Sequence, residues 1–343
     1  MKAMVLKGPN LPFQLEQRPD PAAGPGEAVA RVITCGAGLT IQHAKAGRRK
    51  VQFPRIIGHE ITGEIVEVGA GVRGLKVGDP VTTYFYLNCG HCRWCLTNLE
   101  PLCENTGGQV GLECDGAYAE YVKLPAQNFI RLPDGLDYKE HPAEIGVVTD
   151  ALATPYKVLR RARVRAGETV AVIGAGGGLG IHQLMMAKWA KARGIAVDTK
   201  PNKFEACRKA GADEVVDASS GRVVEQLMDL TKGQGVDVVV DYVSATATLE
   251  AGAKALARRG RLVTLGGSGQ PFQASSAEML NKEQDLLGSR YVTRSEVLES
   301  LDLVARGEVF PWVSVVRPLE EAEAVHALVE RGEVIGRAAL RIA

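Results

Sequence analysis

The sequence has few aromatic residues, no long hydrophobic run and almost no net charge. Aromatic residues make up 5% of the 343 positions, so the core must be built mainly from aliphatic side chains. The 41 lysines and arginines against 40 aspartates and glutamates give no electrostatic reason to expect nucleic acid or an anionic membrane as a partner. No apolar stretch approaches the roughly 20 residues that span a bilayer. The first residues lack an apolar segment of the secretory type, so we expect a cytoplasmic protein.

The overall composition is that of a folded protein with many glycines. Hydrophobic residues at 45% and charged residues at 24% are typical of a folded soluble protein and exclude disorder as the main state. The 39 glycines predict many tight turns. At roughly 150 residues per domain, the length corresponds to two domains.

Two sequence patterns follow each other along the chain. Residues 1–149 contain short apolar or alternating runs broken by glycine turns, which predicts a small β-rich, barrel-like domain. Over 150–292, apolar strands alternate with helical patterns, which predicts a doubly wound parallel sheet with helices on both faces. Residues 293–343 contain one helical segment and a closing strand, and we expect them to return to the first domain. The predicted fold class is therefore α/β with two domains.

A glycine-rich loop at 174–180 (GAGGGLG) lies between a predicted buried strand and a helix, where a dinucleotide would bind. Glycines let the backbone approach the phosphates, and the helix N-terminus supplies N–H donors. Asp198 ends the next strand, 18 residues after the loop, where an acidic side chain accepts hydrogen bonds from the adenosine ribose and repels a 2′-phosphate. The order of these pieces predicts NAD as cofactor, although each piece alone could serve packing or capping. The expected loop contacts are Gly174, Gly176, Gly177, Gly178, Leu179 and Gly180.

Four of the seven cysteines lie within one short segment. The pattern C-x2-C-x2-C-x7-C is formed by Cys89, Cys92, Cys95 and Cys103. Four thiolates complete a tetrahedral zinc shell and leave no open position for chemistry. The sequence therefore predicts a structural zinc, whereas the separate Cys35, Cys114 and Cys207 are expected to be packing residues.

Together these features resemble the medium-chain dehydrogenases, and within them the zinc-containing alcohol dehydrogenases. The resemblance covers essentially the whole chain and also rests on Gly58-His59-Glu60, Gly78-Asp79 and the segment 115–121 (DGAYAEY). It implies a GroES-like catalytic domain with an inserted Rossmann domain, and hydride transfer between NAD(H) and a small alcohol or carbonyl substrate. It also implies a homodimer or homotetramer. Lys203 falls where the family places a lysine on the adenosine ribose.

The resemblance is incomplete at the family's catalytic zinc. That zinc binds an early cysteine, the histidine of the Gly-His-Glu triplet and a third ligand, usually cysteine; the matching positions here are Gly38, His59 and Asp150. His59 could hold a metal together with Glu60 and Asp150, or it could form a metal-free buried ion pair with Glu60. Asp150 could equally cap the helix that begins there. Loss of the thiolate weakens zinc binding, and Ile41 replaces the aspartate that orients the ligand histidine.

Thr40 and His43 match the family's proton relay, which carries the alcohol proton to solvent while hydride goes to nicotinamide. The leading hypothesis is therefore an NAD-dependent alcohol dehydrogenase. One alternative is a zinc-free reductase of activated C=C bonds, in which hydrogen bonds stabilise charge on a distal oxygen. The other is a catalytically silent NAD-binding protein. The sequence identifies no partners for the histidines at 91, 141, 182 and 326.

Overall fold

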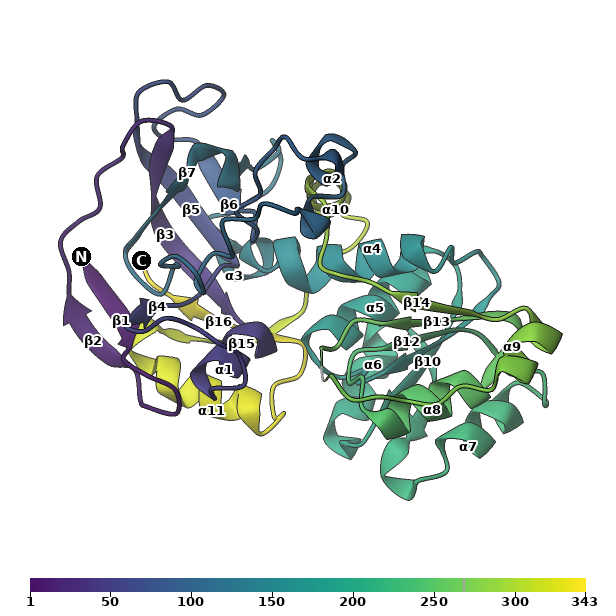
Figure 1. The fold of residues 1–343 in the computed structure, drawn as a ribbon. Coiled ribbons are helices and arrows are strands. Elements are labelled where there is room, and N and C mark those ends of the chain that lie inside the picture. The colour runs from purple at the N-terminus through teal and green to yellow at the C-terminus, as the bar shows by residue number, and fades with distance from the viewer. Residues whose placement is uncertain (268) are drawn as a thin grey trace. The chain divides into compact units, whose positions relative to one another are not determined.

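The computed structural model describes residues 1–267 and 269–343, which form two compact units (Figure 1). Unit 1 consists of residues 1–153 and 292–343, and unit 2 of residues 154–291. The sequence placed these boundaries after residues 149 and 292. Within the described ranges, no helix has both the length and the apolar character needed to cross a membrane.

Unit 1 is built on a seven-stranded sheet with the order β15-β16-β3-β5-β6-β8, in which β7 also pairs with β3. The strands are β3 (Glu27–Ala37), β5 (Ile61–Val68), β6 (Pro80–Thr83), β7 (Tyr121–Pro125), β8 (Phe129–Arg131), β15 (Val313–Pro318) and β16 (Arg337–Arg341). A smaller sheet has the order β2-β1-β4, from β1 (Lys2–Leu6), β2 (Gln14–Gln17) and β4 (Arg55–Ile56). The predicted β-rich first domain is confirmed.

Short helices connect and cover these strands. They are α1 (Leu39–Lys45), α2 (Arg93–Leu96), α3 (Pro142–Gly146), α10 (Arg294–Ala305) and α11 (Ala322–Glu330), with 3-10 turns η1 (Glu100–Leu102), η2 (Ala126–Asn128) and η6 (Leu319–Glu321). The prediction of one helical segment after residue 293 was wrong, because α11 follows α10. In α11 the buried Ala322, Val325 and Val329 repeat with helical spacing over only nine residues. The π-helix η3 (Val148–Leu152) precedes the unit boundary.

Unit 2 is a six-stranded parallel sheet with the order β11-β10-β9-β12-β13-β14. The strands are β9 (Thr169–Ile173), β10 (Arg193–Asp198), β11 (Ala212–Asp217), β12 (Val236–Asp241), β13 (Leu256–Thr264) and β14 (Asp285–Gly288). Their order reverses between β9 and β12, as in a Rossmann fold. The valine-rich strands bury Val197, Val239 and Ile173 in one core, because helices cover a parallel sheet on both faces.

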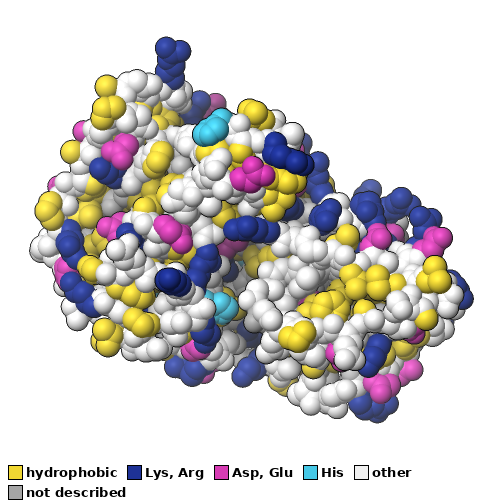
Figure 2. Space-filling model, viewed as in Figure 1, with side chains coloured by type: hydrophobic (Ala, Val, Ile, Leu, Met, Phe, Trp, Pro, Cys, Tyr) yellow, Lys and Arg dark blue, Asp and Glu magenta, His cyan; other side chains and the backbone are white. Residues whose placement is uncertain are grey.

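The helices of unit 2 alternate with the strands. They are α4 (Ala153–Arg161), α5 (Gly178–Trp189), α6 (Phe204–Ala210), α7 (Val223–Leu230), α8 (Thr246–Lys254) and α9 (Ser276–Lys282), with 3-10 turns η4 (Pro201–Lys203) and η5 (Ala218–Ser220). The predicted doubly wound domain is confirmed. On the face shown in Figure 2, basic and acidic side chains lie interspersed.

Candidate functional site

The four clustered cysteines face one another in a lobe of unit 1 around α2. Four of the distances between their Sγ atoms are 3.6–3.9 Å, and all four atoms lie within 4.8 Å of one another. A tetrahedral zinc with bonds of about 2.3 Å to sulfur requires sulfurs about 3.8 Å apart. The donor set therefore fits a zinc ion. Among the described residues, no other group of His, Cys, Asp and Glu side chains has such an arrangement.

Backbone groups support the same lobe. The N–H of Cys92 points at Sγ of Cys89, and the N–H of Cys89 points at Sγ of Cys103, both at 3.4 Å. Backbone hydrogen bonds from His91 and Cys92 lower the pKa of the Cys89 thiol, which favours the thiolate that a metal binds. Trp94 holds the lobe from outside through a 2.9 Å hydrogen bond from its Nε1 to Glu104. These contacts hold the segment that carries the four sulfurs in place.

The glycine loop of unit 2 connects β9 to α5 and cannot accommodate side chains at two of its positions. A Cβ atom on Gly180 would lie 2.2 Å from the carbonyl oxygen of Gly174, and a Cβ on Gly176 would lie 2.5 Å from Cδ of Lys203. Gly174 itself has a φ of +77°, which favours glycine. The backbone is therefore packed tightly against the start of α5, as a phosphate-binding turn requires.

Asp198, at the end of β10, is bonded directly to this loop. Its Oδ2 accepts a hydrogen bond from the N–H of Gly176 at 2.8 Å, and its Oδ1 accepts one from the N–H of Lys200 at 3.0 Å. The buried Lys203 lies beside them; burial lowers the pKa of its amine, and the charge of Asp198 opposes this shift. The structure thus brings Asp198 and Lys203 to the loop.

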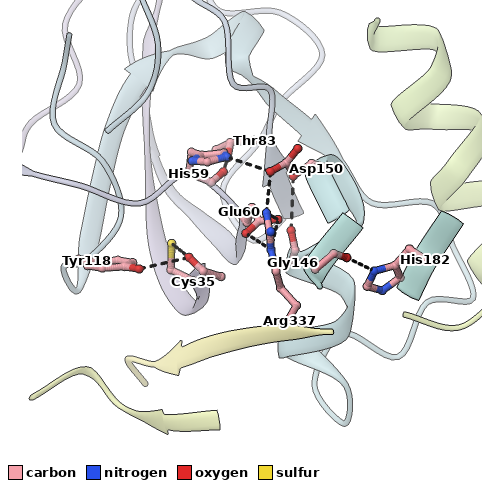
Figure 3. A network of polar contacts seen from close by, with 12 residues as sticks. Cys35, His59, Glu60, Thr83, Tyr118, Gly146, Asp150, His182 and Arg337 are labelled. Carbon is pink, nitrogen blue, oxygen red and sulfur yellow. Dashed lines mark hydrogen bonds and ion pairs between the residues drawn. The ribbon is translucent and has the colours of Figure 1, made fainter. Parts of the chain in front are cut away.

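Two of the positions that match the family's catalytic zinc ligands, His59 and Asp150, lie together with Glu60 and Arg337 in unit 1 (Figure 3). The Nη2 of Arg337, the first residue of β16, donates to Glu60 at 2.8 Å and to Asp150 at 2.6 Å. Its Nε donates to both oxygens of Glu60 at 3.0–3.1 Å. Asp150 lies inside η3, so it does not occupy the capping position considered for it.

Gly38 and His59 complete this cluster. A Cβ atom on Gly38 would lie 2.5 Å from Cζ of Arg337, so the guanidinium fills the space of a side chain at position 38. The buried ring of His59 lies on Phe85, with centroids 4.2 Å apart. Its Nε2 is 3.8 Å from Oδ2 of Asp150. The buried ion pair that the sequence suggested between His59 and Glu60 is not formed, because Glu60 pairs with Arg337 instead. As folded, this donor set does not fit a metal ion.

At this cluster, burial disfavours the charged forms of the side chains, whereas the attraction between opposite charges favours them. Burial raises the pKa of Glu60, and the positive charge of Arg337 acts against this. Burial alone would lower the pKa of Arg337, but the carboxylates of Glu60 and Asp150 raise it above its usual value. The guanidinium therefore stays charged at every physiological pH.

Thr40 and His43 lie three residues apart on α1, directly after Gly38, so they share one side of that helix. Partial burial lowers the pKa of His43, and the positive charge of Arg48 acts in the same direction. The structure thus places both residues of the predicted relay on the helix that begins beside the Arg337 cluster. It does not by itself connect them.

The sequence did not identify Arg337, nor the partners of His182 and His326. His326 is buried, with Nε2 2.8 Å from the Tyr118 hydroxyl and Nδ1 2.7 Å from Oε1 of Gln42. Burial lowers the pKa of His326 to about 3, which keeps the ring neutral. Nδ1 of His182 is 2.6 Å from the carbonyl oxygen of Gly178. The available signal for Arg337 was the glycine at position 38, which leaves room for another side chain.

Comparison with known proteins agrees with this architecture. The family model described as zinc-binding dehydrogenase matches residues 178–306, and the alcohol dehydrogenase GroES-like domain matches residues 24–134. An NAD-dependent alcohol dehydrogenase from Sulfurisphaera tokodaii is 32% identical over 350 residues, covering 99% of each chain. An acryloyl-coenzyme A reductase from Metallosphaera sedula is 31% identical over 345 residues, also covering 99% of each. The alcohol dehydrogenase structure from Aeropyrum pernix superposes with a TM-score of 0.91 at 32% identity, covering 99% of this chain and all of that one.

These matches and the two-unit fold define an oxidoreductase. The chain belongs to the medium-chain dehydrogenases, in the branch of the zinc-type alcohol dehydrogenases. It is an enzyme of the alcohol dehydrogenase type, with a GroES-like unit 1 and a Rossmann-type unit 2.

Proposed function

We propose that the protein transfers a hydride between NAD(H) and a small alcohol or carbonyl substrate. The observation that carries the proposal is the loop at 174–180, hydrogen-bonded to Asp198 at the end of the next strand. The nicotinamide of NAD, when bound, supplies the hydride acceptor or donor. The loop backbone would hold the pyrophosphate, and Asp198 and Lys203 would bind the adenosine ribose. The full-length match to an NAD-dependent alcohol dehydrogenase supports this assignment.

Thr40 and His43 would move the substrate proton. A hydroxyl at position 40 can take the proton of an alcohol and pass it on to the imidazole of His43 and then to solvent. The lowered pKa of His43 keeps this ring neutral at pH 7, so it can accept the proton. In the reverse direction the same groups deliver a proton to the carbonyl oxygen.

The cysteine lobe would hold a structural zinc, with Cys89, Cys92, Cys95 and Cys103 as ligands. The tetrahedral spacing of the sulfurs supports this proposal. We also propose that the protein is cytoplasmic and, by the family resemblance, that it forms a homodimer or homotetramer. Light scattering on the purified protein measures the number of subunits.

Reduction of activated C=C bonds is a second candidate function. The observation that favours it is the guanidinium among the residues that match the catalytic zinc ligands. Conjugate reduction places negative charge on a distal oxygen, which hydrogen bonds can stabilise without a metal. The relative named acryloyl-coenzyme A reductase supports the same chemistry.

A substrate panel distinguishes these functions. Alcohols are offered with NAD, and saturated ketones, aldehydes and enones are offered with NADH. Turnover of alcohols and saturated carbonyl compounds is the expected result. NADH oxidation with enones alone would establish the second candidate instead. Tight NADH binding without turnover of any compound would identify a silent NAD-binding protein.

Replacing Asp198 by alanine is expected to weaken NADH use while affecting NADPH less. Hydrogen bonds to a charged group contribute about 1.5–3 kcal/mol, which corresponds to a loss of about 10–100-fold in kcat/KM for NADH. Steady-state kinetics with both cofactors measures this change. Asp217, its neighbour in register on β11, provides the matched control, and Asp217→Ala should leave kcat/KM unchanged. Equal losses in both variants would refute the ribose assignment.

Removing the Thr40 hydroxyl with Thr40→Val is expected to lower kcat for alcohol oxidation by about 100-fold or more, because proton transfer by a positioned group contributes that much. Thr40→Ser retains the hydroxyl and should retain most activity. In the wild type, kcat should also fall as the pH drops through the lowered pKa of His43, since the protonated ring cannot accept a proton. A pH profile unchanged in His43→Gln would contradict the relay.

A further inference from the structure

The side chain of Arg337 lies at the centre of the residues that match a metal site in this family. The cluster is buried: Arg337 is 6% exposed and Glu60 is 1% exposed. The guanidinium donates to both carboxylates, and it fills the space next to Gly38. Three of the four positions around it are the sequence matches of zinc ligands. The fourth, Glu60, is the neighbour of the ligand histidine.

We propose that the guanidinium of Arg337 takes the place of the catalytic metal in this chain and that Gly38 makes room for it. The ring of His59 then donates a hydrogen bond to the substrate oxygen. The part that concerns His59 rests on the proposed function. The part that concerns Arg337 and Gly38 is independent of any activity.

A metal ion and Arg337 compete for the same oxygen. Oδ2 of Asp150 is the carboxylate atom that lies 3.8 Å from Nε2 of His59, so a metal shared by these residues would bind there. The same oxygen accepts a 2.6 Å hydrogen bond from Nη2 of Arg337. A metal bonded to it at about 2.1 Å would lie within about 4.7 Å of that nitrogen. Two positive charges at this distance in a buried site repel strongly, and arginine cannot relieve the repulsion by losing its proton.

Gly38 and Arg337 are matched to each other. With the guanidinium in its present place, any side chain at position 38 would meet it, because even a Cβ atom would lie 2.5 Å from Cζ. A cysteine ligand at position 38 and this conformation of Arg337 therefore exclude each other. The glycine is what allows the arginine to reach Glu60 and Asp150.

His59 is left without a hydrogen bond by this arrangement. The ring is 2% exposed, and among the described residues neither Nδ1 nor Nε2 has a hydrogen-bond partner. A buried polar group without a partner costs free energy, so native proteins supply one from the protein, water or a ligand. A substrate carbonyl oxygen is such a partner, because it accepts the N–H of a neutral imidazole. This hydrogen bond would stabilise the charge that develops on that oxygen.

Metal content tests the first part of the proposal. Wild type and the double variant Gly38→Cys/Arg337→Ala are loaded with zinc, freed of excess, and analysed for zinc per chain. We expect one zinc in the wild type, held by the cysteine lobe, and two in the double variant. Adding His59→Ala to the double variant should return it to one. Thermal unfolding confirms that each variant is folded.

Two outcomes would overturn this part. One is a wild type that binds two zinc ions and loses one on His59→Ala. The other is a folded double variant that stays at one zinc. If the double variant does not fold, the wild type and its His59→Ala variant still decide the question, because equal zinc contents of one are expected.

Kinetics tests the part that concerns His59. With NADH and the best substrate of the panel, His59→Ala should lower kcat/KM by about 100-fold, the usual effect of removing one such donor. His59→Gln, whose amide can donate, should remain within about tenfold of the wild type, and zinc content should not change in either. Two variants as active as the wild type would overturn this role. A wild type without any turnover would refute the proposed function, while the zinc measurements would still decide the role of Arg337.

Discussion

Replacing Cys95 by serine is expected to release the zinc of the cysteine lobe and to lower the melting temperature of the protein substantially. The four sulfurs already have the spacing of a tetrahedral zinc shell, so the loss of one leaves an incomplete site. Structural zinc sites bind with about 10–16 kcal/mol in small peptides, and this binding energy stabilises the fold. A loss of about 3 kcal/mol would lower the melting temperature by about 6–12 °C in a unit of this size. Elemental analysis and calorimetry measure the two effects.

Cys114 provides the control for this experiment. It is half-buried like Cys95 but belongs to no cluster of metal-ligating side chains among the described residues. Cys114→Ser should therefore keep its zinc and most of its stability. If Cys95→Ser also retained one zinc per chain and the wild-type melting temperature, the lobe would not be a structural zinc site.

Replacing Gly180 by alanine is expected to destabilise unit 2 and to weaken NADH binding. The added methyl group would lie 2.2 Å from the carbonyl oxygen of Gly174, and this backbone atom cannot rotate away as a side chain can. Overpacking of this kind typically costs about 1–3 kcal/mol. The dissociation constant for NADH should rise at least tenfold, because the loop must shift away from the start of α5. Thermal unfolding and fluorescence titration with NADH measure the two effects.

Gly177 lies in the same loop and allows a comparison. A Cβ atom there would come no closer than 3.3 Å to the Gly174 carbonyl oxygen, and the φ of −82° suits any residue. Gly177→Ala should therefore leave the melting temperature within about 1–2 °C of the wild type. Equal destabilisation by the two substitutions would show that the contact with Gly174 is not what requires glycine at position 180.

The elements that sequence reasoning predicted correctly are those with a strong local signal. Strand β9, the glycine loop and α5 follow one another within 21 residues, so hydrophobic pattern and glycine spacing suffice to identify them. The same holds for the cysteine lobe, whose four cysteines all lie within residues 89–103. Helix α11 was missed because its nine residues are too few for the helical repeat of buried positions to stand out.

The sequence alone determined the family, the two-unit architecture, the position of the cofactor loop and the cysteine pattern, since each depends on residues that are close in the chain. Only the tertiary structure brought Arg337 to Glu60 and Asp150, which precede it by 277 and 187 positions. It likewise joined His326 to Tyr118 across 208 positions. Such contacts follow no fixed spacing, because the folding of β16 beside β3 creates them. The sequence shows by the glycine at position 38 that no metal-binding side chain stands there. That the Arg337 guanidinium fills this space is visible only in the folded sheet.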